Sequence, residues 1–166
     1  MHNTLIVFAS NHGTVERCAR ELFKLIEGKV DLCNLNRREA IPDLKHYDTL
    51  IVGGSIHYGK IQGVIAGFCK NNQADLADKR LGLFINCLYP GEKARQQLEG
   101  AFPEDLSRHA LVCDYFGGEL NEKRMNCWER FITRQIVRSE ELEVMLYKDK
   151  ITRFAEIISS DHEEKD

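Results

Sequence analysis

Residues 5–9 form a short, unbroken apolar run, and the chain then switches to a helical period. A run of this length without alternation is typical of a strand that is covered on both faces, as in a parallel sheet. The apolar residues that follow recur at helical spacing and predict a helix with one buried stripe: Val15, Cys18, Ala19, Leu22, Phe23 and Ile26. A buried strand that leads directly into such a helix indicates an α/β fold.

The loop between this strand and helix is small and polar, and consists of Ser10, Asn11, His12, Gly13 and Thr14. The first backbone N–H groups of a helix have no partner within the helix, and the helix dipole favours negative charge beside them. We therefore expect this loop to bind an anion, most simply a phosphate. The alternative is an ordinary strand-to-helix turn in which the side chain of Ser10 or Thr14 caps the helix.

Strands and helices continue to alternate along the chain. Further strands are predicted at 29–35, 49–52, 81–88 and 110–116, and helices at 61–72, 92–100, 122–138 and 150–159. This alternation predicts right-handed crossovers and one five-stranded parallel sheet with helices on both faces. The second strand carries charges that suit an edge, which favours the strand order 2-1-3-4-5. The helix at 122–138 is one more than the alternation requires before the C-terminal helix.

Three polar or glycine-rich loops follow strands of this predicted sheet. They contain Ser10–Thr14, Gly53–Gly59 and, after the strand that ends in Asn86–Leu88, Tyr89–Gly91; Gly117–Gly118 closes the last strand. In the order 2-1-3-4-5, a ligand binds beyond the carboxyl ends of the strands, where the chain order switches between strands 1 and 3. The convergence of these loops at one edge predicts a ligand site there.

The size and charge of the chain narrow its class. Its 166 residues fit a single domain, expected at 1–160, followed by a charged, frayed tail at 161–166. The net charge of −3 argues against nucleic acid as a partner. No apolar run approaches 18 residues and the first strand begins almost at Met1, so we expect a cytoplasmic protein.

The six cysteines include no C-x-x-C pair. We therefore expect no zinc site, iron–sulfur site or disulfide, and interpret the cysteines mainly as small core residues.

The first loop, Ser10 to Val15, resembles the Ser/Thr-x-Thr-Gly-x-Thr phosphate loop of the flavodoxin superfamily. Two positions depart from that pattern: His12 stands where Thr or Asp is usual, and Val15 stands where the last Thr is usual. The resemblance extends over nearly the whole chain. It implies a flavodoxin-like three-layer sandwich with FMN as the cofactor.

A second group of motifs resembles menaquinone-dependent protoporphyrinogen oxidase within that superfamily. Residues 54–59 (G-S-I-H-Y-G) are similar to its Gly/Ala-Ser-Ile-Arg-Tyr-Gly segment, and residues 117–120 and 127–131 are similar to its last loop and extra helix. The resemblance implies an FMN-dependent oxidoreductase with a quinone acceptor and a porphyrinogen substrate. The alternative is a plain electron-transfer flavodoxin that serves a redox-partner protein.

The resemblance also assigns the cofactor-binding residues. The phosphate would be held by Ser10, Asn11, His12, Gly13, Thr14 and Val15, and the isoalloxazine ring would lie along Gly54, Ser55, Ile56, His57, Tyr58 and Gly59. Asn86, Cys87, Leu88 and Tyr89 would form a second wall, with Phe116, Gly117 and Gly118 further away. Tyr58 would stack on the ring or cover its edge. The simpler interpretations are that Tyr58 and Tyr89 pack on the surface, His57 is solvated and Cys87 is a buried wall residue. No residue is assigned as a general acid or base.

The predicted helix Glu122 to Arg138 is basic on one side and aromatic on the other. Its cationic residues are Lys123, Arg124, Arg130, Arg134 and Arg138, and its apolar residues include Trp128, Phe131 and Ile132. Such a helix suits peripheral contact with an anionic membrane, where a quinone is available, or the propionates of a porphyrin. The simpler expectation, which we favour from the sequence, is a solvated face on a helix that covers the sheet.

Overall fold

The computed structural model of the chain describes residues 2–10, 13–120, 123, 125–139 and 142–160. Asn11, His12, Glu122, Arg124 and the predicted tail at 161–166 lie outside the described residues.

The centre of the fold is a sheet of five parallel strands. They are β1 (Asn3–Phe8), β2 (Lys29–Asn34), β3 (Thr49–His57), β5 (Arg80–Asn86) and β6 (Val112–Tyr115), in the order β2-β1-β3-β5-β6. Because β5 and β6 are the fourth and fifth parallel strands, this is the predicted order 2-1-3-4-5, with the charged second strand at an edge. A short strand, β4 (Lys60–Ile61), pairs antiparallel with the end of β3.

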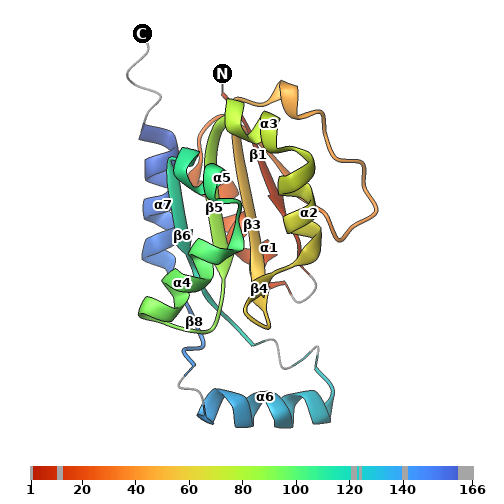
Figure 1. Cartoon of the computed structure of the whole chain (residues 1–166), viewed down its shortest axis with the longest axis vertical. Helices are drawn as coiled ribbons and strands as arrows, with labels where there is room; N and C mark the ends of the chain where they lie inside the picture. The colour runs from red at the N-terminus through yellow and green to blue at the C-terminus, as the bar shows by residue number, and fades with distance from the viewer. Residues whose placement is uncertain (1, 11–12, 121–122, 124, 140–141, 161–166) are drawn as a thin grey trace.

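Helices cover both faces of the sheet (Figure 1). One face carries α1 (Thr14–Leu25) and α7 (Lys148–Ser160). The other carries α2 (Gly63–Asn71), α3 (Gln73–Asp78), α4 (Gly91–Ala101) and α5 (Glu104–His109), and the single-turn η1 (Leu44–His46) lies before β3. The predicted three-layer α/β architecture is therefore confirmed.

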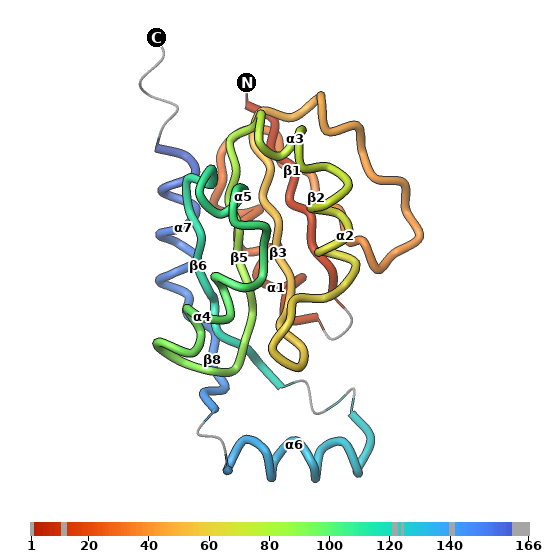
Figure 2. Tube along the Cα trace, viewed as in Figure 1, coloured from red at the N-terminus to blue at the C-terminus, as the bar shows by residue number. Residues whose placement is uncertain are grey.

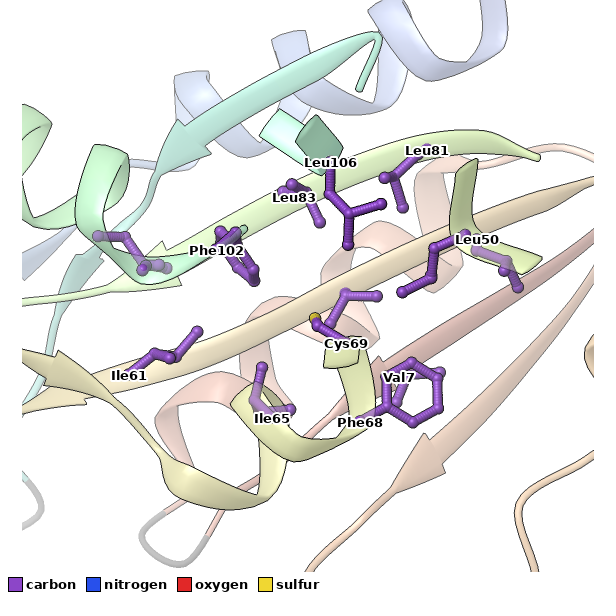
Figure 3. Packing of buried hydrophobic residues seen from close by; sticks show 14 of the residues in the cluster. Val7, Leu50, Ile61, Ile65, Phe68, Cys69, Leu81, Leu83, Phe102 and Leu106 are labelled. Atoms are coloured by element: carbon purple, nitrogen blue, oxygen red, sulfur yellow. The ribbon is translucent and has the colours of Figure 1, made fainter. Parts of the chain in front are cut away.

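The buried strands supply side chains to two separate cores. Successive strand residues point to opposite faces, so Leu5 and Val7 join the core under α2 to α5, whereas Ile6 and Phe8 join the core under α1 and α7. Figure 3 shows the first of these cores, where side chains of α2 meet those of the strands. The unbroken apolar run at residues 5–9 reflects burial on both sides, as predicted.

Two helical positions are more exposed than the apolar pattern predicts. Phe23 of α1 is 45% exposed and Val64 of α2 is 41% exposed. Phe23 lies about 100° around the helix from buried Leu22, which carries it past the part of α1 that the sheet covers. The rest of the predicted α1 stripe is buried.

Several predicted boundaries are wrong. β3 continues through residues 53–57, which were expected to form a loop, and Ile61 belongs to β4 rather than to the following helix. The six-residue helices α3 and α5 were not predicted, because each is too short to show a full helical stripe.

The segment between β6 and α7 departs furthest from expectation. Figure 2 shows the trace leaving the sheet, entering α6 (Cys127–Ser139) and returning to α7. The strands β7 (Gly117–Gly118) and β8 (Met145–Leu146) pair antiparallel at the base of this excursion. Helix α6 lies across the carboxyl end of the sheet and has no buried residue, so the expectation of a helix covering the sheet is wrong.

The cysteines follow the core prediction except at one end of α6. Cys18, Cys33, Cys69 and Cys87 are buried and Cys113 is half-buried, but Cys127 is exposed. Burial raises the pKa of the Cys69 thiol to about 12 and that of Cys87 to about 11, which suppresses the reactive thiolate.

Alkylation of the native protein at pH 8 should therefore label Cys127 first. Burial and suppressed ionisation make the four buried cysteines slow by comparison. Peptide mass spectrometry after a short iodoacetamide pulse measures the sites, and Cys127→Ser should remove the fast-labelled site. Equally fast labelling of Cys87 would contradict the described burial.

Ionisation of the Tyr47 hydroxyl lowers the stability of the fold at alkaline pH. Tyr47 is buried and donates a hydrogen bond to Asp31 Oδ2 at 2.9 Å. Burial and the Asp31 carboxylate raise the pKa of Tyr47 to about 12, against about 10 in an unfolded chain. The folded state therefore holds this proton more tightly, and the resulting stability is complete below pH 10 and lost as the pH rises towards 12.

We expect Tyr47→Phe to remove this contribution to the fall in the free energy of unfolding at alkaline pH, which amounts to at most about 2–3 kcal/mol. Urea unfolding of both proteins from pH 9 to pH 12 measures the difference in slope. Tyr58→Phe is the matched control, because Tyr58 is fully exposed at a hairpin tip. An identical slope for wild type and Tyr47→Phe would contradict this account.

Among the described residues, no helix combines the length and the hydropathy needed to cross a bilayer.

Candidate functional site

A cavity of about 360 Å³ opens at the carboxyl end of the sheet. Its walls come from the loop after β1, from the carboxyl ends of β3 and β5, from the segment after β6 and from the α6 excursion. The lining residues are Ser10, Thr14, Val15, Ser55, Ile56, His57, Gln62, Asn86, Cys87, Leu88, Gly118, Glu119, Leu120, Met125, Thr133, Ile136, Val137 and Leu142. The predicted convergence of the loops is thus seen in the structure, and α6 forms a largely apolar roof.

The first wall is the start of α1. Gly13 is the N-cap residue, adopts a left-handed conformation (φ 89°) and carries no side chain to cap the helix. Ser10 Oγ accepts a hydrogen bond from the Gly13 N–H at 3.0 Å instead of capping the first turn. The alternative in which the side chain of Ser10 or Thr14 caps the helix is therefore wrong. The amides of the first turn lie at the cavity, and no side chain among the described residues caps them.

The charged side chains near the start of α1 carry a net positive charge, which favours the binding of an anion there. Glu16 lies in the first turn, but its Oε1 contacts Arg20 Nη2 at 2.9 Å and Arg37 Nη2 at 3.0 Å. Arg17 Nη1 contacts both carboxylate oxygens of Glu119, at 2.6 and 2.8 Å. Three guanidinium groups against two carboxylates leave the cluster positive overall, which complements the helix dipole.

The second wall is the β3–β4 hairpin. A Cβ at Gly53 would lie 2.1 Å from Phe84 Cζ, so this strand position accepts only glycine unless the ring moves. Gln62 Oε1 accepts from the Ser55 N–H at 3.2 Å and holds the two arms of the hairpin together.

The tip of this hairpin does not line the cavity. Tyr58 (φ 51°) is fully exposed, and neither it nor Gly59 lines the cavity. Gly54 lies beside Ile65 and Gln62, behind the wall. Of the predicted hairpin residues, the structure brings Ser55, Ile56 and His57 to the site.

The third wall follows β5. Asn86 Nδ2 donates to the Gly117 carbonyl at 2.8 Å, and its Oδ1 is buried without a hydrogen-bond partner among the described residues. Cys87 Sγ donates to the Tyr89 carbonyl at 3.6 Å, in keeping with a buried wall residue. Tyr89 itself lies under Lys93 Nζ, 3.6 Å from the ring centroid, and does not line the cavity.

The residues that close β6 divide between the core and the site. Phe116 is fully buried and stacks on Phe84 with ring centroids 4.8 Å apart, so it belongs to the core beneath the cavity. Gly117 pairs with Leu146 of β8. Gly118 lines the cavity, where an added Cβ would lie 2.8 Å from Leu88 Cδ2.

Several lining residues were not singled out by the sequence: Gln62, Glu119, Leu120, Met125, Thr133, Ile136, Val137 and Leu142. Glu119 and Leu120 belong to the motif at residues 117–120. The contribution of α6 had no signal in the sequence, because an apolar stripe on a helix does not indicate what the stripe contacts. A second hollow of about 300 Å³ adjoins the roof and is lined by Leu120, Arg134, Val137, Arg138 and Val144. It shares Leu120 and Val137 with the main cavity.

A family model described as "Flavodoxin domain" matches residues 5–145 of the chain. No curated protein sequence matches the chain.

Solved structures share the fold over their full length. A short-chain flavodoxin associated with a PDU bacterial microcompartment aligns with a TM-score of 0.63 and 16% identity, covering 97% of this chain and 99% of that one. Oxidised flavodoxin 1 from Bacillus cereus aligns with a TM-score of 0.58 and 14% identity, covering 95% of this chain and 97% of that one. Fusobacterium nucleatum flavodoxin bound to flavin mononucleotide aligns with a TM-score of 0.52 and 12% identity, covering 97% of this chain and 99% of that one.

Proposed function

The chain belongs to the flavodoxin domain family, and on this premise we propose that it binds FMN in the rim cavity and oxidises an apolar, carboxylate-bearing small molecule. The observation that carries the proposal is the α6 roof over the cavity. A protein that only passes electrons to a partner protein has no need of a covered site, whereas a substrate enzyme does.

The described residues fit FMN in size, charge and donor set. The uncapped first turn of α1 offers amides to a phosphate, and the surrounding arginines leave that end positive. The cavity volume lies in the range of cofactor sites, and its walls are mainly apolar. The unpartnered Asn86 Oδ1 offers an acceptor to a ligand hydroxyl or N–H.

The residues have separate roles in this proposal. Thr14 and Val15 hold the phosphate through backbone N–H groups, while Ser55 to His57 and Cys87 to Leu88 form walls for the ring. When bound, FMN supplies the electron and hydride chemistry. The half-buried apolar residues Val137 and Leu142 limit the access of water to the reacting face.

The second hollow suggests the class of substrate. Arg134 and Arg138 lie one helical turn apart on α6, and both line a hollow that adjoins the cavity roof. Guanidinium groups in that arrangement suit carboxylates on an otherwise apolar molecule. This chemistry agrees with the porphyrinogen substrate and quinone acceptor implied by the sequence resemblance, and we propose a protoporphyrinogen oxidase-like activity.

The purified protein and a turnover assay test this proposal. We expect flavin absorption bands near roughly 370 and 450 nm, characteristic of the cofactor, and oxidation of protoporphyrinogen with a soluble menaquinone analogue. Arg134→Gln together with Arg138→Gln should raise KM for the porphyrinogen and leave that for the quinone unchanged. Flavin bands with rapid electron exchange but no turnover would identify a plain electron carrier instead, and an absence of flavin binding would refute the proposal.

The outer surface of α6 supports peripheral membrane contact, where a quinone is found. Trp128 and Phe131 are 69% and 56% exposed and stack on each other with centroids 6.1 Å apart. Arg130 and Arg138 lie on the same helix. An exposed aromatic pair on a helix that also carries basic residues is typical of a helix that lies in the membrane interface.

Co-sedimentation with vesicles tests the membrane contact. Binding to vesicles with anionic lipid should fall by roughly two orders of magnitude when Arg130, Arg134 and Arg138 become glutamine, at about 1 kcal/mol per charge. The matched control replaces Lys45, Lys70 and Arg95, which lie exposed on other elements. Equal binding by the two triple variants would exclude a membrane role for α6.

A further inference from the structure

The side-chain amide of Asn86 has a defined orientation. Its Nδ2 lies 2.8 Å from the Gly117 carbonyl oxygen and 3.4 Å from Cys18 Sγ. A carbonyl oxygen only accepts hydrogen bonds, so the amide nitrogen, and not the amide oxygen, must face Gly117. The amide oxygen is therefore directed elsewhere and is not used by this contact.

That amide oxygen is the unsatisfied part of the residue. Asn86 is 3% exposed, and its Oδ1 has no hydrogen-bond partner among the described residues. A buried acceptor without a donor is costly, so it calls for a partner that the described residues do not provide. Asn86 lines the rim cavity, and a ligand there can supply the donor. An acceptor favours a hydroxyl or an N–H group and disfavours an anion.

The position of Asn86 selects one segment of the ligand. Its neighbour Cys18 lies on α1, one helical turn after Thr14. Thr14 is the first residue of α1 and belongs to the proposed phosphate site. On the other side Asn86 is paired in register with Ser55, which begins the wall proposed for the ring. Asn86 thus adjoins both the helix proposed to hold the phosphate and the strand proposed to flank the ring. In FMN, the ribityl chain with its three hydroxyl groups spans these two parts.

We propose that Asn86 Oδ1 accepts a hydrogen bond from a ribityl hydroxyl, which makes Asn86 a specificity residue for flavins that carry a polyol chain. This inference rests on the proposed binding of FMN. It assigns Asn86 to the part of FMN that joins the phosphate to the ring.

Ligand substitution on the wild-type apoprotein tests this directly. We expect one of the 2′-, 3′- and 4′-deoxy analogues of FMN to bind about tenfold more weakly than FMN, the size of one hydrogen bond. Flavin fluorescence quenching gives each dissociation constant without relying on turnover. Equal affinity of all three analogues and FMN would overturn the role of Asn86. If FMN itself does not bind, the proposed function fails first.

Variants of Asn86 complete the comparison. Asn86→Leu should weaken FMN and riboflavin by about tenfold and leave lumiflavin, which lacks the ribityl chain, within twofold. The sensitive deoxy analogue should lose nothing further on this variant. Asn72→Leu is the matched control, because its Nδ2 donates to the Phe68 carbonyl away from the cavity. An equal loss for lumiflavin and riboflavin would show a structural role only and overturn the proposal. Should Asn86→Leu fail to fold, the wild-type ligand series still decides.

Discussion

Phe84→Ala is expected to destabilise the fold by about 3–5 kcal/mol. Phe84 is fully buried in β5, stacks on Phe116 and meets the edge of Phe154 at a centroid distance of 6.2 Å. Its ring also fills the space where Gly53 of β3 has no side chain. Truncation would leave a cavity that these rigid neighbours cannot close.

Urea unfolding, followed by circular dichroism, measures this loss. Phe131→Ala is the matched control, because Phe131 is an exposed phenylalanine on α6 and its truncation should change stability by less than about 0.5 kcal/mol. Gly53→Ala should also destabilise, since its Cβ would lie 2.1 Å from the ring, and Phe84→Leu should rescue part of that loss. Additive losses in the Gly53→Ala and Phe84→Leu double variant would contradict this packing.

Thr14→Asp is expected to weaken FMN binding by about a hundredfold to a thousandfold. Thr14 is the first residue of α1 and lines the cavity beside the amides proposed to hold the phosphate. A carboxylate about 4 Å from a phosphate charge is repelled by about 4 kcal/mol at the effective dielectric of a protein surface. The same carboxylate at a helix start stabilises the helix by about 0.3–1 kcal/mol, so the loss would not arise from unfolding.

Thr14→Asn is the control for this change, because asparagine has nearly the shape of aspartate but no charge. It should keep FMN affinity within about tenfold, the size of one hydrogen bond. Riboflavin, which lacks the phosphate, should bind Thr14→Asp and Thr14→Asn about equally. A matching loss of riboflavin affinity in Thr14→Asp would place the new charge beside the ring rather than beside a phosphate.

The strands and their order were predictable because their signal is local. Burial on both faces forces continuous apolar runs such as Leu5 to Ala9, and the charged β2 identifies one edge. The glycines of β3 predict a loop where the strand in fact continues. A glycine is needed at position 53 because the Phe84 ring on the next strand occupies the space of a side chain. No local sequence pattern reveals that contact.

The placement of α6 was not predictable for a related reason. Its period shows that Trp128 and Phe131 share a face with Ile132, but periodicity does not say what that face contacts. The structure puts Ile136 and Val137 over the cavity and leaves the aromatic pair exposed. The unpartnered oxygen of Asn86 is likewise visible only once Gly117 and Cys18 are placed beside it.

The central claim is that the uncapped start of α1 holds the phosphate of FMN. Titration of the apoprotein with FMN and with riboflavin tests it most directly. Two charge-assisted hydrogen bonds at about 1.5–3 kcal/mol each predict that FMN binds at least about a hundredfold more tightly than riboflavin. Equal affinities for the two flavins, or no binding of either, would contradict the claim.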